Sequence, residues 1–553
     1  MKTVCWLVCL GLVAGQAEAK SRAEEALDAA KTGDLEALKR AVTTTAEANA
    51  TDDAGRTPLH WASEGGFADA VDVLLARGSV VSASDKMDKT PLHLACAKGD
   101  AAVAALLLAR NANLAAIDWE EKTPLHRACE KGREAVAALI AGRMQERQIT
   151  LDVRDKETRT PLHLAVIGDF RQAGDFVAIE DMLLRKGADV LAADRDGRTA
   201  LHWAAVRGYP RSAVLLVDRA TDRRAFVNAP DKRGRLALHW AADNGAAPVL
   251  QILLNAPPDR RSDLDARDLD GRTALHLAAR SGHAGAVRFL LDQKAEIEAV
   301  DNAGQTPLHM AGNDGRAEVA GILIAAKAVV GAVDRKGQTP LHLAAQGGFV
   351  NVVSVLIDGE ANVQTADAAG LTPLHVAVAN NRYNVVALLL DRRADINGAD
   401  REGRTPSHVA AENNAVNAEK LLIERGANIN ARNRSGETPL DVAVRRSSAL
   451  MVKLLMDNAA QQGLPPEVKI VAAESAPSAA TGGTGPSSTP PPTVTPVVTP
   501  VVAPTMVTPA IAPPTVTPPM VTPAIAPPTV TPPLVTPAVV PPANGGSTPA
   551  VGP

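Results

Sequence analysis

A four-residue motif, Thr-Pro-Leu-His or a close variant, recurs along this chain at a nearly fixed interval. Most copies begin 33 residues after the preceding one, and four steps in the middle of the chain are 37 or 39 residues long. The twelve copies begin at Thr57, Thr90, Thr123, Thr160, Thr199, Leu236, Thr273, Thr306, Thr339, Thr372, Thr405 and Thr438. A period of this length indicates a stacked array, because each small unit can bury its apolar face only against its neighbours.

The motif itself predicts the start of a helix. Threonine caps the first free amides of a helix, and the proline that follows fits the first turn, where its missing N–H costs nothing. A glycine such as Gly66 ends this helix, and a second apolar stretch such as 350–357 forms another. Asn381 and Asn414 occupy the glycine position in two copies, and asparagine also tolerates a left-handed backbone. An Asp-x-x-Gly signal, as in 334–337, adds a hairpin turn between units.

Together these features resemble the ankyrin repeat family, in which each unit is a β-turn finger followed by two antiparallel helices. The resemblance implies an all-α solenoid of stacked ankyrin repeats. Motif copies cover about 52–458, and a motif-free apolar pair, 23–30 and 35–42, precedes them as an N-terminal capping unit. Asp441 replaces histidine in the last copy, as expected of an atypical terminal repeat. We expect about 13 repeats, caps included, over residues 20–460.

Histidine placement tests most directly for a catalytic or metal site. Eleven of the 12 histidines are the fourth residue of the motif, and only His283 is left over. The motif histidines are His60, His93, His126, His163, His202, His239, His276, His309, His342, His375 and His408. Recurrence once per unit indicates a structural hydrogen bond between finger and helix, and His283 alone cannot form a metal site. With no phosphate-binding loop, nucleophile elbow or zinc-type cysteine spacing either, we expect no enzyme activity, metal or cofactor.

The N-terminal segment has the three parts of a secretory signal peptide. Lys2 is followed by an apolar run over 4–14 and by the small-residue site Ala17-Glu18-Ala19. Cleavage is expected after Ala19, so residues 1–19 would be removed and the protein would be secreted or periplasmic. The run is too short to span a membrane, and no transmembrane segment is expected after cleavage. An uncleaved amphipathic anchor is the alternative.

Two cysteines remain once the signal peptide is removed. Cys96 and Cys129 occupy equivalent helix positions in successive units. One layer of stacking, roughly 8 to 10 Å, exceeds the roughly 7 Å between Cα atoms that a disulfide allows. We expect two buried thiols and an array that depends on its apolar core.

The composition changes completely from about residue 461. No Asp, Glu, Lys or Arg follows Glu474, and the 14-residue sequence of 506–519 is repeated without change in 520–533. Proline removes hydrogen-bond donors and restricts the residue before it, so such a segment cannot build helices or sheet interiors. Residues 461–553 are predicted to be a disordered Pro/Thr/Val-rich tail that acts as a spacer, with a glycosylated stalk or a wall-interacting tail as alternatives.

Charge placement gives the best indication of what the array binds. The net charge of −4 gives no sign of a polyanion binder, and no nucleic acid partner is expected. In proteins similar to this one, partner contacts come mainly from the finger tips and the exposed end of the first helix. Carried over by spacing, those positions between Lys86 and Arg280 hold 17 basic and 6 acidic residues. The predicted partner-binding residues are Lys86, Lys89, Trp119, Lys122, Lys156, Arg159, Arg195, Arg198, Arg207, Lys232, Arg233, Arg235 and Arg272.

The basic region also contains a tryptophan and three fingers that lack glycine. Trp119, at a finger tip, is a candidate anchor, whereas Trp61, Trp203 and Trp240 directly follow the motif histidine and are predicted to pack on the helix. The finger glycine is replaced in three successive units, by Asp88, Glu121 and Thr158, and these fingers are expected to bend differently or to be looser. The alternative for the charges is a merely solvated polar face.

The sequence therefore predicts an exported, monomeric and non-catalytic protein–protein interaction module. It would bind a partner with an acidic surface through the concave face of fingers and inner helices, in the basic central region. A second possibility is a structural cell-envelope or surface protein that uses the array as a spacer or as a binder of anionic polymer. A third is a secreted effector or inhibitor. Fold alone does not identify the partner.

Overall fold

The computed structural model describes residues 22–168, 177–258 and 261–461. The predicted signal peptide and all but the first residue of the predicted tail lie outside these ranges. Within them the chain forms helices and turns with no strand, as the predicted all-α array requires. None of the helices described here is both long and apolar enough to cross a membrane.

Each motif copy begins the first helix of a repeat. In Pro58–Gly65 the motif proline is in the first turn, Thr57 is the N-cap, and His60 in the third position completes a capping box. The C-cap Gly66 has a φ of 82°, a left-handed conformation in which glycine has no steric cost. The first helices are α4 (Pro58–Gly65), α6 (Pro91–Lys98), α8 (Pro124–Glu130), α10 (Pro161–Ile167), α12 (Ala200–Arg207), α15 (Ala237–Asp243), α17 (Ala274–Ser281), α19 (Pro307–Asn313), α21 (Pro340–Gly347), α23 (Pro373–Ala379), α25 (Pro406–Asn413) and α27 (Pro439–Arg445).

The second helix of each repeat packs antiparallel to the first and buries an apolar side. In Ala68–Ala76 the buried residues are Ala70, Val71, Leu74 and Leu75, which are three and four positions apart. The second helices are α5 (Ala68–Ala76), α7 (Ala101–Ala109), α9 (Glu134–Glu146), α11 (Val177–Arg185), α13 (Pro210–Arg219), α16 (Ala247–Leu254), α18 (Ala284–Asp292), α20 (Ala317–Ala325), α22 (Val350–Asp358), α24 (Tyr383–Asp391), α26 (Val416–Glu424) and α28 (Ala449–Gln461).

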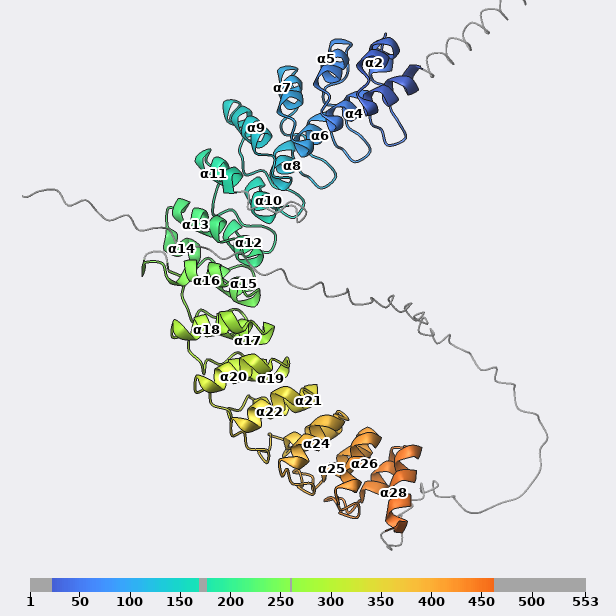
Figure 1. Cartoon of the computed structure of the whole chain (residues 1–553), viewed down its shortest axis with the longest axis vertical. Helices are drawn as coiled ribbons and strands as arrows, with labels where there is room; N and C mark the ends of the chain where they lie inside the picture. Colours follow the sequence, from blue (N-terminus) through green and yellow to red (C-terminus); the bar gives the residue numbers. More distant parts are fainter. Residues whose placement is uncertain (1–21, 169–176, 259–260, 462–553) are drawn as a thin grey trace, which may run out of the picture. The chain divides into compact units, whose positions relative to one another are not determined.

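Neighbouring repeats stack first helix on first helix and second helix on second helix. Figure 1 shows the two rows, with α4, α6 and α8 in one and α5, α7 and α9 in the other. The core is continuous from one repeat to the next, and the motif leucines Leu59, Leu92 and Leu125 are fully buried in it. Each repeat therefore depends on its neighbours for burial, as in other linear arrays.

The longer repeats use their extra residues differently from one another. In the repeat that begins at Thr123, α9 is 13 residues long, whereas α7 has 9. In the repeat that begins at Thr199, an extra helix, α14 (Arg223–Val227), follows α13. Asp222 caps α14, and its Phe226 is buried in the common core. The inserted segments enlarge the side of the array formed by the second helices.

An N-terminal helical pair precedes the first motif copy. A helix over 22–32 is followed by Gly33, in a left-handed conformation, and by α2 (Leu35–Ala41). A further short helix, α3 (Thr45–Ala48), begins with a capping box between Thr44 and Glu47. The Asn49 amide then donates to the Gly78 carbonyl at 3.0 Å and ties this unit to the next repeat.

Cys96 and Cys129 are free, buried thiols. Burial raises the pKa of both thiols far above the usual range for cysteine. Neither thiol is therefore a reactive thiolate at neutral pH.

Candidate interaction surface

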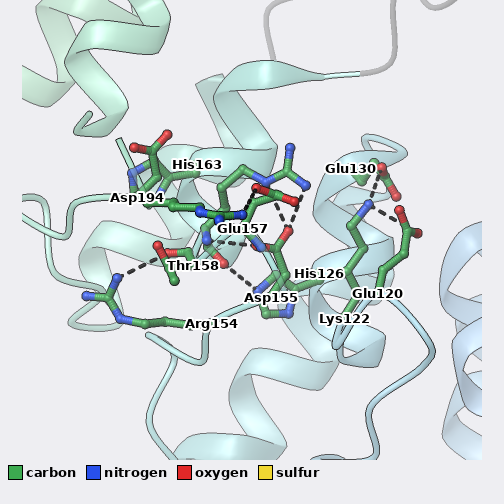
Figure 2. Close-up of polar contacts among 12 residues, drawn as sticks. Glu120, Lys122, His126, Glu130, Arg154, Asp155, Glu157, Thr158, His163 and Asp194 are labelled. Carbon is green, nitrogen blue, oxygen red and sulfur yellow. Dashed lines mark hydrogen bonds and ion pairs between the residues drawn. The ribbon is translucent and has the colours of Figure 1, made fainter. Parts of the chain in front are cut away.

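A buried or half-buried aspartate organises each finger except the last, in which Asn433 takes its place. The Asp155 carboxylate accepts hydrogen bonds from the backbone amides of Glu157, at 3.0 Å, and Arg159, at 2.8 Å. The same pattern of amides two and four residues after the aspartate recurs in fingers along the array, as for Asp85 and Asp334. Figure 2 draws Asp155 and its polar contacts. Because the carboxylate satisfies the turn amides, Lys156 and Glu157 are left exposed at the tip.

The three fingers without glycine have the same geometry as the others. Asp88, Glu121 and Thr158 have φ values of 55°, 56° and 57°, in the left-handed region that glycine normally occupies. Their amides still close the turn onto the carbonyls of Asp85, Asp118 and Asp155, at 2.7 to 2.9 Å. The expectation that these fingers bend differently is therefore wrong, and the alternative that they are looser stays a prediction.

Backbone hydrogen bonds fix each finger tip against the preceding one. The residue after the finger aspartate donates its amide to a carbonyl in the previous finger, as Lys156 does to Glu120 at 3.0 Å and Arg195 to Glu157 at 3.0 Å. We call the residues at this position in five consecutive fingers the tip row. They are Lys86, Trp119, Lys156, Arg195 and Lys232. The tip row is thus a line of side chains held at regular spacing by a backbone ladder.

Side chains of the tip row are exposed. The Trp119 ring is 49% exposed, and the side chains of Lys86, Lys156 and Lys232 are exposed as well. Arg195 lies 3.7 Å from Glu157, a distance at which a solvent-exposed pair contributes little. Arg233, one residue beyond the row, is exposed as well. The row therefore offers cationic groups and one aromatic ring to solvent.

The basic residues that directly precede the motif are oriented differently. Lys122 is only 3% exposed, and its ammonium lies 2.8 Å from Glu130 and 3.5 Å from Glu120 (Figure 2). Burial alone would raise the pKa of Glu130, but the contact with Lys122 lowers it. Arg235 is 5% exposed and lies 3.3 Å from Asp243 and 3.4 Å from Asp268. The prediction that Lys122 and Arg235 bind a partner does not fit the structure, because neither side chain presents its charge to solvent.

Three other predicted residues that directly precede the motif are partly neutralised by carboxylates. Arg159 forms an ion pair with Asp155 at 2.9 Å, Arg198 pairs with Asp196, and Arg272 pairs with Asp268 and Asp270. These carboxylates belong to the arginines' own fingers, so the positive balance of the region is smaller at the surface than in the sequence.

Lys89 and Arg207 complete the predicted set, and both are half-buried. The Lys89 carbonyl lies 3.0 Å from Nε2 of His60, so its backbone is part of the contact between repeats. Arg207 lies in the last turn of α12, at the end of the first helix.

Three tryptophans of the first helices are held by polar contacts to the finger of their own repeat. The indole N–H groups of Trp61, Trp203 and Trp240 donate to Asp52, Asp194 and Asp231, at 2.9 to 3.0 Å. The Arg198 guanidinium lies 4.7 Å from the ring centre of Trp203 and 5.2 Å from that of Trp240, a cation–π arrangement. These rings connect a finger to its helix, in contrast to the exposed Trp119.

Motif histidines join each repeat to the next. His126 Nδ1 lies 3.1 Å from the Thr123 amide and 2.9 Å from its hydroxyl, while Nε2 lies 3.0 Å from the Arg159 carbonyl. All eleven make equivalent contacts to the finger of the following repeat. Burial lowers the pKa of every one, to about 4 for His126 and His276. Over the described ranges, His, Cys, Asp and Glu side chains form no group of three or more suited to a metal ion.

Two exposed apolar residues beside Trp119 were missed in the sequence. Met87 is 43% exposed, and its carbonyl accepts the Trp119 amide at 3.1 Å. Ile117, two residues before Trp119, is 53% exposed. The available signal was Met87, at a finger position that is polar in most other repeats, whereas the position of Ile117 also carries Val300 and Val333 in later repeats. Together with the tip-row lysines, these residues form an apolar patch with a cationic border.

Family comparisons agree with this architecture. A family model described as "Ankyrin repeats (3 copies)" matches residues 27–118, 171–262, 238–334 and 313–400. A second, described as "Ankyrin repeats (many copies)", matches residues 394–443. A search of curated proteins found no match to the chain.

Proposed function

Because the chain belongs to the ankyrin repeat family, whose repeats are generally protein–protein interaction modules, we propose that it binds a protein partner through the tip row. The observation that carries this proposal is the exposure of Trp119 between the cationic side chains of Lys86 and Lys156, beside Met87 and Ile117. Tryptophan dominates many interfaces, and a desolvated ring with a charged border is typical of a binding hot spot.

The chemistry of this surface favours a partner with acidic and apolar groups side by side. Lys86, Lys156, Arg195 and Lys232 would attract carboxylates and raise the association rate. The apolar patch would then supply most of the affinity. The backbone ladder keeps the tips at fixed positions, so little conformational entropy is lost on binding. Binding of this kind involves no covalent chemistry, in keeping with a family whose members are typically non-catalytic.

Affinity capture from native extract tests this function. The full chain is compared with a variant in which Lys86, Lys156, Arg195 and Lys232 are changed to glutamate. A control variant carries the same four-charge reversal in the second-helix row. Its positions are Lys294 and Lys327, just after second helices, and Lys420 and Lys453, within them, and all four are exposed. Because all eight positions are exposed, both variants should fold with unchanged helical content.

The expected result is a specific protein retained by the parent and by the control variant and lost by the tip-row variant. Trp119→Ala should weaken its binding at least about tenfold, as loss of an interface anchor does. Retention of the same protein by the tip-row variant would contradict the proposal. If the parent retained an anionic polymer and both variants lost it equally, the structural cell-envelope function would be favoured, because that function needs only nonspecific positive charge.

We also propose that the protein is exported, on the basis of the signal-peptide pattern in residues 1–19. Mass spectrometry of the protein from its native source should find the N-terminus at Lys20 in the extracellular or periplasmic fraction. A chain that keeps residues 1–19 and stays in the cytoplasm would contradict export, and the tip-row proposal would remain to be tested separately.

A further inference from the structure

The finger that follows the tip row carries a second exposed apolar side chain. Leu269 comes directly after the finger aspartate Asp268, the position that defines the tip row, and its amide donates to the Arg233 carbonyl at 2.9 Å. The Leu269 side chain is 70% exposed, more than that of Trp119. A Cβ on Gly234 would lie only 3.2 Å from Leu269 Cγ, so the base of this side chain rests on the preceding finger while the rest is open to solvent.

Trp119 and Leu269 enclose three cationic finger tips. Lys156, Arg195 and Lys232 lie between them, one in each intervening finger, and all three side chains are exposed. The order along this part of the array is therefore apolar, basic, basic, basic and apolar. An apolar anchor at each end of a charged run defines both the length and the charge of the group that it can bind.

The carboxylates beside these tips are largely neutralised within the fingers. Asp196 pairs with Arg198 of its own finger, and Asp270 pairs with Arg272 in the same way. Glu157 is exposed and lies 3.7 Å from the tip guanidinium of the next finger, a pair that contributes little. An approaching carboxylate therefore meets a row in which the positive charges of the tips prevail.

The spacing of these tips is set by the stacking of the repeats. The backbone hydrogen bond between fingers is 2.9 to 3.0 Å long at each of the steps from Trp119 to Leu269, although the repeats behind the fingers differ in length. The extra residues of the longer repeats thus leave the fingers stacked. One layer is roughly 8 to 10 Å thick, so the four steps cover on the order of 32 to 40 Å.

A polyproline II segment matches this spacing. It has about three residues per turn and rises about 3.1 Å per residue, so every third side chain returns to the same side after about 9.3 Å. A β-strand returns to the same side after about 6.6 to 6.8 Å, and an α-helix after about 5.4 Å. Either of these would place side chains between the tips, where the row offers them no partner. Twelve steps of polyproline II rise about 37 Å, which is the length from one apolar anchor to the other.

We propose that the stretch from Trp119 to Leu269 binds an acidic polyproline II segment of a partner protein, about 13 residues long; this inference rests on the proposed function. The first and last residues of the segment are apolar and contact Trp119 and Leu269. Three carboxylates, at every third position between them, pair with Lys156, Arg195 and Lys232. A preformed polyproline II segment loses little conformational entropy on binding, and neither do the fixed finger tips. The chain's own proline-rich sequence has no Asp or Glu after residue 474 and therefore lacks this pattern.

Fluorescence anisotropy of two labelled peptides with the full chain tests this inference. The peptide LPAEPAEPAEPAL has leucine at both ends and a carboxylate at every third position, whereas LPAPAEEEPAPAL has the same composition and charge with its carboxylates adjacent. The first peptide should bind at least about tenfold more tightly than the second. Its affinity should fall at least about tenfold in the Leu269→Ser variant. The matched control, Val329→Ser, changes an exposed valine outside the finger tips and should leave the affinity unchanged.

Three results would overturn this inference. Equal binding of the two peptides would show that the tips respond to charge alone, and unchanged binding in Leu269→Ser would remove the second anchor. Failure of both peptides to bind would also reject the extended segment. The affinity capture described above separates these results from failure of the proposed function. If a protein is still captured by the parent and lost by the tip-row variant, the proposed function stands and the partner presents a folded acidic surface. If the tip-row variant retains that protein, the proposed function fails as well.

Discussion

Nε2 of His202 lies 3.0 Å from the carbonyl oxygen of Arg235, which belongs to the next repeat. On its other side, Nδ1 lies 3.1 Å from the Thr199 amide and 3.0 Å from the Thr199 hydroxyl. Because the amide can only donate, Nδ1 is the acceptor and Nε2 carries the proton. One neutral imidazole thus caps its own helix and holds the following finger.

Replacing His202 by alanine should destabilise the array. The Arg235 carbonyl and the Thr199 amide lose their partner at a buried position, and the ring leaves a cavity. The expected cost is about 3 kcal/mol in the free energy of unfolding, measured by urea denaturation. Lys232→Ala, an exposed change in the neighbouring finger, is the control and should stay within about 0.5 kcal/mol of the parent. Equal stability of the two variants would show that the bond between repeats contributes little.

Acid should weaken the array before most carboxylates titrate. A buried histidine whose pKa lies below its unfolded value of about 6.5 leaves stability intact above that pH and removes it as the pH falls toward the folded pKa. For His126, whose pKa falls to about 4, the loss reaches about 3 kcal/mol by pH 4. Eleven such histidines act together, so the urea midpoint should fall steadily between pH 7 and pH 5. A constant midpoint across this range would contradict the neutral-imidazole arrangement.

Two lysines that look alike in the sequence should behave differently. Lys122 is 3% exposed and bound by Glu130, whereas Lys156 is exposed at its finger tip. Lys122→Glu would bury a third negative charge beside Glu120 and Glu130 and should lower stability by about 3 kcal/mol or more. Lys156→Glu should change stability by no more than about 0.5 kcal/mol. Thermal unfolding of both variants separates them, and similar losses would mean that Lys122 is not held as the structure has it.

The contrast between these lysines shows where sequence reasoning reaches its limit. The array, its turn residues and the position of every motif histidine were predictable, because the same local signals recur twelve times. The direction of the Lys122 side chain was not predictable, because it depends on an ion pair with Glu130, eight residues later in α8. The patch formed by Met87 and Ile117 with Trp119 depends likewise on the register between fingers, which no single repeat contains.

The finger turn at Thr158 should be improved by glycine. Thr158 has a φ of 57°, and a β-branched residue is strained in this left-handed conformation. Thr158→Gly should raise stability by about 1 kcal/mol and the melting temperature by a few degrees. Gly337→Thr makes the reverse change at the equivalent turn of a regular finger, where φ is 74° and a Cβ would lie 2.7 Å from the Ala368 amide. It should be clearly destabilising, and a neutral result for both variants would exclude strain at these turns.

A buried carboxyl near the C-terminal end should make stability depend on pH in the opposite sense to the histidines. Glu419 of α26 is 0% exposed, and its oxygens make no hydrogen bond of normal geometry within the described chain. Burial raises its pKa to about 8, and the neighbouring Ser407 hydroxyl opposes this only in part. The carboxyl therefore stays protonated in the folded state at neutral pH, while it ionises above about pH 4.5 in the unfolded state.

Glu419→Gln tests this directly, because the amide keeps the shape of the protonated acid but cannot ionise. The stability that a raised pKa provides is complete below about pH 4.5 and is lost as the pH rises toward 8. The variant should therefore gain on the order of 3 kcal/mol over the parent at pH 7.5 and nothing at pH 4.5. Hydrogen exchange of amides in α25 and α26 at the two pH values measures this locally. An equal difference at both values would mean that Glu419 does not titrate on unfolding.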